Sequence, residues 1–184
     1  MTETTTQPLS RRLLTQLQKI ETTRLHFDSA LIGFATRLLF ASVLLRYFWS
    51  SALTKLDGFG LSLNAYAQIF PRQMEAAGYD VSALGPLAHV IVAAGTFAEI
   101  LLPLLVVIGL FTRLSALAMI GFVIVMTLTD IIGHGVGQPT IGLPFDRFPD
   151  ALIADQRLIW VWMLAILALT GGGYVSADRA LSRR

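Results

Sequence analysis

Apolar residues fill four stretches of this chain, and each stretch is about as long as a membrane helix. About 20 predominantly apolar residues in a helix cross the hydrocarbon of a bilayer, where unpaired backbone groups cannot face lipid. We expect the four spans at about residues 32–56, 86–110, 114–133 and 157–175. The pattern therefore predicts an all-α fold, an integral membrane four-helix bundle.

The segment before the first span has a different pattern. Apolar residues recur there at helical spacing, with basic residues between them (Leu13, Leu14, Leu17 and Ile20; Arg11, Arg12, Lys19 and Arg24). This pattern is typical of an interfacial amphipathic helix on an anionic leaflet. We expect three parts: a cytoplasmic tail with the amphipathic helix at 1–28, a four-span membrane domain at 29–178, and a basic cytoplasmic tail at 179–184.

The composition supports a membrane protein and excludes several function classes. Of the 184 residues, 54% are apolar and 14% are charged, whereas about 25% are charged in soluble domains. The absence of cysteine excludes a disulfide scaffold, an iron–sulfur cluster and thiol chemistry by this chain itself. A net charge of +2 is too small for a nucleic-acid-binding protein, so we expect the lipid bilayer as the main partner.

Basic residues outside the span interiors are distributed unevenly. Eight fall on the side of the two termini and four on the other side (Arg11, Arg12, Lys19, Arg24, Arg113, Arg179, Arg183 and Arg184 against Lys55, Arg72, Arg147 and Arg157). The positive-inside rule then predicts that both termini are cytoplasmic. The two long connections, at about 57–85 and 131–156, would face outward and offer room for a membrane or periplasmic protein partner.

Two charges fall near the middle of predicted spans. Arg46 lies in the first span and Glu99 in the second, and opposite charges at equal depth are far cheaper paired than apart. We expect them to face each other. The pair could form a polar site for an anionic head group, a quinone carbonyl or a proton, or it could be a structural ion pair that fixes helix register.

Two further charges, Arg37 and Lys55, interrupt the first span. They are 18 residues apart, which is five helical turns, so they share one helix face while Arg46 lies on the opposite face. Either the helix bends so that all three reach the site, or Arg37 and Lys55 snorkel to the two interfaces.

A third group of residues marks the outer face. The candidates are Trp49, His89, Asp130 and His134, as hydrogen-bonding or proton-relay groups or as plain interfacial residues. Their spacing lacks the H-x-x-x-H and H-E-x-x-H patterns of metal ligands, so we expect no metal site.

Several motifs resemble the DoxX family. The segments Phe97–Pro103 (FAEILLP) and Gly109–Leu114 (GLFTRL) are similar to its central motif, and Gly171–Asp178 (GGGYVSAD) is similar to its closing motif. Arg37 and the stretch Trp49–Lys55 also resemble its first helix, although Ser51 or Ala52 stands where the family has glycine and Arg46 is an additional charge.

The resemblance implies a four-helix protein of the bacterial inner membrane, and it carries over Arg37, Lys55, Glu99 and the inner-turn residue Arg113. Members of the family have been linked to thiosulfate:quinone oxidoreduction and to membrane complexes that protect against oxidants. We therefore expect an accessory or anchor subunit of a redox or stress-response system rather than a stand-alone enzyme, with a quinone as the candidate ligand. The alternatives are a small proton-coupled transporter, which would require a homo-oligomer, and a purely structural scaffold.

Overall fold

The computed structural model describes residues 28–182, which form helices and one short hairpin. The amphipathic helix predicted within residues 1–28 falls outside the described residues, apart from Asp28. The first connection holds the antiparallel strands β1 (Leu56–Asp57) and β2 (Gly60–Leu61), the helices α4 (Leu63–Ile69) and α5 (Pro71–Ala76), and the short turn η2 (Val81–Ala83). The second connection holds α8 (Gln138–Ile141), and α10 (Ala177–Ser182) follows the last long helix.

Four helices are long and apolar enough to cross a membrane, as the sequence predicts. The first, Ser29–Thr54, combines α2 (Ser29–Phe40), the π-helical turn η1 (Ala41–Leu45) and α3 (Arg46–Thr54). The second is α6 (Pro86–Ile108). The third joins α7 (Thr112–Leu128) to the π-helical turn η3 (Thr129–His134). The fourth joins the π-helical turn η4 (Leu152–Arg157) to α9 (Leu158–Thr170).

The fourth helix is displaced from its predicted bounds of 157–175. It starts at Leu152, because the η4 turn extends α9 into the connection that the sequence assigns to a loop. It ends at Thr170, because Gly171 adopts a φ of 80°, which favours glycine and breaks the helical path.

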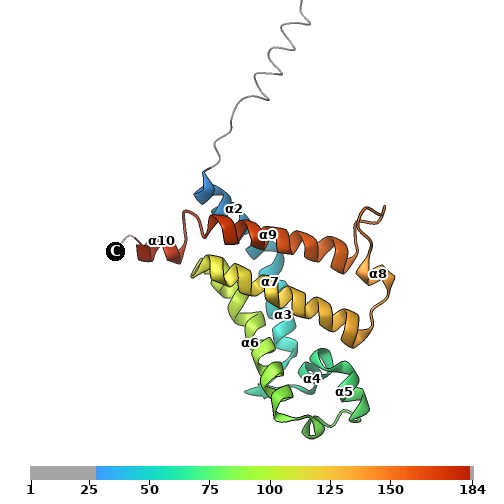
Figure 1. The fold of residues 1–184 in the computed structure, drawn as a ribbon. Coiled ribbons are helices and arrows are strands. Elements are labelled where there is room, and N and C mark those ends of the chain that lie inside the picture. Colours follow the sequence, from blue (N-terminus) through green and yellow to red (C-terminus); the bar gives the residue numbers. More distant parts are fainter. Residues whose placement is uncertain (1–27, 183–184) are drawn as a thin grey trace, which may run out of the picture.

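The long helices form two pairs, α3 with α6 and α7 with α9 (Figure 1). The pairs approach each other near the end of the bundle that holds α10, and they diverge toward the two long connections. The α4–α5 segment stands at the open end between them, where α5 contacts η3. This arrangement leaves a wedge whose walls come from both pairs.

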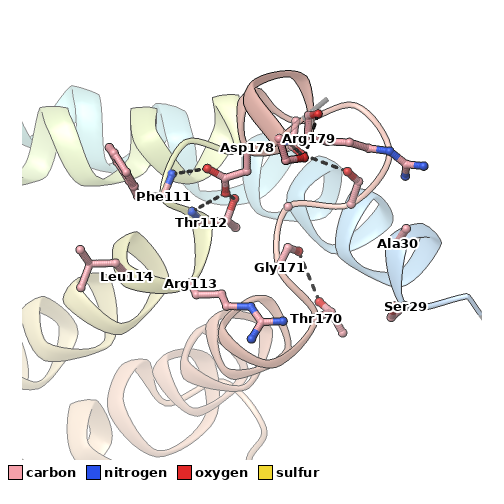
Figure 2. A pocket seen from close by; sticks show the side chains of 14 residues that line it. Ser29, Ala30, Phe111, Thr112, Arg113, Leu114, Thr170, Gly171, Asp178 and Arg179 are labelled. Atoms are coloured by element: carbon pink, nitrogen blue, oxygen red, sulfur yellow. Dashed lines mark hydrogen bonds between the residues drawn. The ribbon is translucent and has the colours of Figure 1, made fainter. Parts of the chain in front are cut away.

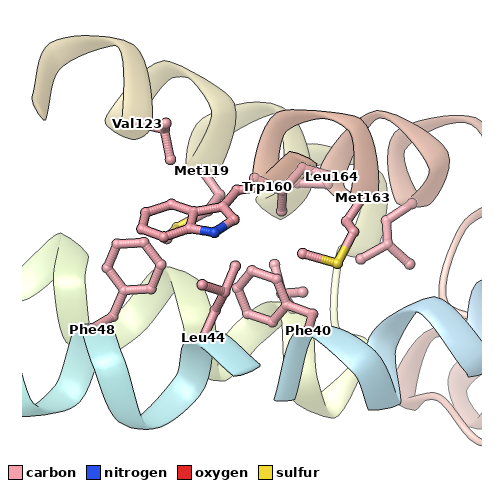
Figure 3. Close-up of a cluster of buried hydrophobic side chains, with 11 residues drawn as sticks. Phe40, Leu44, Phe48, Met119, Val123, Trp160, Met163 and Leu164 are labelled. Atoms are coloured by element: carbon pink, nitrogen blue, oxygen red, sulfur yellow. The ribbon is translucent and has the colours of Figure 1, made fainter. Parts of the chain in front are cut away.

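The main apolar core fills the junction between the two pairs (Figure 3). Figure 3 shows Phe40, Leu44 and Phe48 on the first helix facing Trp160 and Met163 on α9. Helices in lipid gain little from the hydrophobic effect when they associate, so close packing and polar contacts decide their arrangement. The core thus fixes the helix positions through shape, and the buried polar groups add specificity.

The first connection packs on the bundle. Sequence reasoning places Leu63, Tyr66, Ala67 and Phe70 on one helical face that could lie on the outer leaflet. In the structure Leu63 is exposed, but Tyr66 is buried with Met74 in a second cluster that also contains Val92 of α6. The connection therefore covers α6 instead of spreading on lipid.

Candidate functional site

Lys55 and Glu99 form a buried ion pair inside the bundle. The Lys55 Nζ donates to both carboxylate oxygens of Glu99, at 2.9 Å and 2.8 Å, and also to the Ser51 hydroxyl at 2.8 Å. The side chains of Lys55 and Glu99 are 4% and 7% exposed. The α3 helix ends at Thr54, so Lys55 stands at its cap and reaches back toward α6.

The pairing expected between Arg46 and Glu99 is therefore wrong. Arg46 is exposed, and Glu99, which we expected to pair with Arg46, pairs with Lys55 instead. A charged residue at the centre of a membrane helix costs about 2.5–3.5 kcal/mol on insertion scales, and Lys55 lowers that cost for Glu99. The snorkelling alternative is also wrong for Lys55, because its ammonium group turns into the bundle and contacts Glu99.

A second ion pair lies between the third and fourth helices. The Arg157 Nη2 donates to Asp130 Oδ2 at 2.5 Å, and its Nη1 donates to the Thr127 hydroxyl at 3.0 Å. The Arg157 side chain is 4% exposed, and its Nε has no hydrogen-bond partner among the described residues. A buried guanidinium nitrogen without a partner is costly, and the Nε of Arg37 at the opposite end of the bundle is buried without a partner in the same way.

Both ion pairs line one pocket of about 370 Å³ in the wedge between the helix pairs. All four long helices and α4 contribute to its wall. Its polar lining consists of Tyr47, Ser51, Lys55, Gln68, Glu99, Thr129, Asp130, His134 and Arg157. Its apolar lining comes mainly from Ile69, Ile91, Phe122, Val125, Met126 and Leu152.

The hydrogen bond of His134 defines its tautomer in this pocket. Its Nε2 lies 2.9 Å from the backbone carbonyl oxygen of Gln68, which can only accept. The Nε2 therefore carries hydrogen, and in the neutral ring Nδ1 is an acceptor. The pocket thus combines a donor on Arg157 with an acceptor on His134.

The other predicted outer-face residues lie outside this pocket. The Tyr66 hydroxyl and His89 Nδ1 are 2.8 Å apart, and their rings pack edge to face. Trp49 donates from Nε1 to the Ile100 carbonyl at 3.2 Å and so joins α3 to α6. Among the described residues, no group of three or more histidines, cysteines or carboxylates is placed to hold a metal ion.

Arg37 holds the opposite end of the bundle together. It is 5% exposed, and its guanidinium donates to the carbonyls of Val107, at 3.1 Å, and of Val175. The snorkelling alternative is thus wrong for Arg37 as well, because backbone carbonyls inside the protein take the place of water. Gly109 makes room for this contact: its φ is 69°, and a Cβ there would lie 2.1 Å from the Arg37 Nη1.

Asp178 closes the same end by capping α7 (Figure 2). Its carboxylate accepts from the Phe111 N–H at 2.7 Å, the Thr112 N–H at 2.8 Å and the Thr112 hydroxyl at 2.7 Å. Burial alone would raise the pKa of Asp178, but the hydrogen bonds from Thr112 and Phe111, with the charge of Arg37, lower it below its usual value. The segments GLFTRL and GGGYVSAD, far apart in sequence, are therefore in direct contact.

Arg113 is exposed at this end and lines a shallow pocket of about 680 Å³ beside Gly171 and Arg179 (Figure 2). It makes no contact with the buried ion pairs. The residues carried over by the motifs therefore separate into two places: Lys55 and Glu99 in the pocket, and Arg37 and Arg113 at the opposite end.

A comparison with protein family models covers the motifs of the first three long helices. The DoxX family model matches residues 32–134, which include the first three long helices and both members of the Lys55–Glu99 pair. The chain belongs to the DoxX family. The match ends before the closing segment 171–178, so the contact of Asp178 with Phe111 and Thr112 joins that segment to the matched region. No curated protein and no solved structure gives a significant match to the chain.

Sequence reasoning missed Arg157, which it counted only as a loop charge. Asp130 lies four residues before the end of the third long helix and Arg157 five residues after the start of the fourth, and an antiparallel connection returns these two ends to the same depth. The depth comparison that we applied to the first two spans would have brought these residues together. Tyr47 and Gln68 also line the pocket, but nothing in the sequence singles them out, because neither residue type is unusual in a helix.

Proposed function

We propose that this DoxX-family chain is a membrane subunit of a redox or stress-response system, and that its central pocket binds the head group of a quinone-like lipid. The observation that carries the proposal is the pocket itself, whose wall combines two ion pairs and a few other polar groups with aliphatic and aromatic side chains. Small-molecule sites are of this kind, mostly apolar with a few polar groups that fix orientation.

The charge of the pocket favours a neutral ligand. Lys55 and Arg157 are each balanced by a carboxylate, so an incoming anion would meet Glu99 and Asp130 as well as the cations. A quinone head is uncharged, and its carbonyl oxygens would accept from donors of the lining such as the Arg157 guanidinium and the Tyr47 hydroxyl. This argues against the anionic head group that we considered from sequence.

The size of the pocket supports a single ring with its substituents. Small-molecule pockets generally have volumes of about 300–1,000 Å³, and this one lies at the lower end with about 370 Å³. Aliphatic and aromatic side chains such as Ile91, Phe122 and Met126 would contact the faces of the ring. Because the pocket lies within the spanning helices, an isoprenoid tail would remain among the acyl chains.

The geometry favours binding over proton-coupled transport. Both oxygens of Glu99 accept from the Lys55 ammonium group, so the carboxylate is held by a fixed partner. A carboxylate that takes up and releases protons during transport would have to break this contact in every cycle. The scaffold alternative does not account for a pocket of about 370 Å³ that both ion pairs line.

The proposed location is the bacterial inner membrane, with both termini in the cytoplasm. The first helix and the closing segment are at the same end of the bundle, where Tyr174 donates to Asp28. Lys55 and Arg157 lie in ion pairs within the bundle, so of the four basic residues counted on the other side only Arg72 and Arg147 lie in its connections. The excess of basic residues on the side of the termini, which supports the positive-inside assignment, is thus larger than the eight against four counted from the sequence.

A binding measurement on the full chain tests the proposal. Decylubiquinone is titrated into the protein in nanodiscs by calorimetry, with Arg157→Lys to remove the guanidinium while the charge remains. We expect saturable binding that weakens at least tenfold in Arg157→Lys and stays unchanged in the control Arg113→Gln at the opposite end. Binding that is absent, or equal in all three proteins, would contradict the proposal.

A further inference from the structure

Arg46 is an exposed cation on a membrane-spanning helix. It is about five residues beyond the middle of the Ser29–Thr54 span, which places it about 7 Å from the midpoint along the helix axis. No carboxylate of the described residues lies within ion-pair distance of Arg46.

The helix face around Arg46 has the character of an interface between helices. Ser42 and Ser50, one turn before and one turn after Arg46, are both exposed, and so are Leu39, Val43 and Leu53. Small residues allow a second helix to approach closely, and a polar group on a spanning helix is favoured when it meets a partner across the contact. The pocket does not include Arg46, so this face is separate from the quinone-binding site proposed above.

We propose that the face formed by Ser42, Arg46 and Ser50 docks a transmembrane helix of a different protein, which carries an aspartate or glutamate at the depth of Arg46. The charge of Arg46 selects the partner. An acidic side chain within the membrane has a free-energy cost like that of Arg46, and pairing the two charges lowers the cost of both. This proposal goes beyond the proposed function, and it does not depend on quinone binding.

A second copy of this chain lacks the required carboxylate among its described residues. The acidic residues in its spanning helices are Glu99, Asp130 and Asp155. Glu99 is paired with Lys55 and Asp130 with Arg157. Asp155 stands near the start of its helix and accepts from the Ala151 N–H, far from mid-depth. Two copies meeting on this face would also bring like charges together.

Site-specific photocrosslinking in native membranes tests this interface. Benzoylphenylalanine is introduced at Ser42 or Ser50 in the full chain, and at Leu169, an exposed position on α9, as the control. We expect Ser42 and Ser50 to crosslink to a transmembrane segment with an aspartate or glutamate. The yield should fall at least tenfold in Arg46→Leu, remain above half in Arg46→Lys, and return when Arg46→Glu is combined with arginine at the partner's acidic residue.

Three outcomes would overturn the proposal: adducts only with lipid, adducts with a second copy of this chain, or a yield that Arg46→Leu leaves unchanged. An unchanged thermal unfolding midpoint of the purified Arg46→Leu protein shows that the variant is folded, and its decylubiquinone affinity should equal that of the unchanged protein. Loss of the crosslink with normal quinone affinity therefore separates this interface from the pocket.

Discussion

Lys55 and Glu99 face each other across the bundle with three charge-assisted contacts around one ammonium group, two to the carboxylate and one to Ser51. Lys55 comes from the end of the first spanning helix and Glu99 from near the middle of the second. Since these two helices pack along each other, the pair fixes their relative position as well as one wall of the pocket.

The ion pair leads to a prediction about stability. Removing the charge of Glu99 alone leaves a buried ammonium group without its partner, which typically costs about 3–5 kcal/mol. We expect Glu99→Leu to lower the unfolding free energy in detergent by this amount, and Lys55→Met with Glu99→Leu to recover most of the loss. A double variant as unstable as the single one would show that the pair is not the source of the effect.

Asp178 leads to a prediction about acid sensitivity. Its folded pKa lies below its usual value, so its stabilising contribution is present above the unfolded pKa and is lost as the pH falls through the folded pKa. We expect the thermal midpoint to fall as the pH is lowered below about 4, and this fall to be smaller in Asp178→Asn. Glu75→Gln, at an exposed carboxylate of α5, is the matched control and should retain the full acid response.

Asp178→Asn should also lower stability at neutral pH. Loss of a helix cap typically costs about 0.5–2 kcal/mol, and here the carboxylate caps the first turn of α7 through Phe111 and Thr112. Chemical denaturation at pH 7 measures this loss. An unchanged unfolding midpoint at pH 7 would contradict the capping role.

Gly109 and Gly121 offer a comparison within one chain. A methyl group at Gly109 would collide with the Arg37 guanidinium, and its φ of 69° is unfavourable for alanine, whereas a Cβ at Gly121 meets nothing within 4 Å. We expect Gly109→Ala to lower the thermal midpoint strongly. Gly121→Ala, in the middle of α7, should be neutral or stabilising by up to about 1 kcal/mol. Equal effects of the two changes would show that Arg37 does not need the space at Gly109.

Much of the fold could be predicted from the sequence, because the lipid environment imposes a strong pattern. Four apolar stretches gave four helices, and the glycines after the last one end it. The bounds of that helix were less predictable, since the π-helical turn before Leu158 carries polar residues that resemble a loop. A helix end that contains Asp155 and Arg157 has no apolar signal to reveal it.

The site was predicted in part. Equal depth suggested that Glu99 has a cationic partner but pointed to Arg46, whereas helical periodicity already placed Arg37 and Lys55 on a face opposite to Arg46. The structure follows the periodicity: Arg37 and Lys55 are buried and Arg46 is exposed. Depth counted along the sequence failed because the long side chain of Lys55 reaches back from the helix end to a residue near the middle of α6.

The central claim is that a quinone-like head group binds between the two ion pairs, and the position of a covalent label tests it most directly. A photoreactive azidoquinone is activated on the full chain in nanodiscs, and the adducts are mapped by peptide mass spectrometry. We predict adducts on pocket residues such as Phe122 and Met126, suppressed by excess decylubiquinone. Adducts confined to the opposite end near Arg113, or labelling that decylubiquinone does not suppress, would contradict the account.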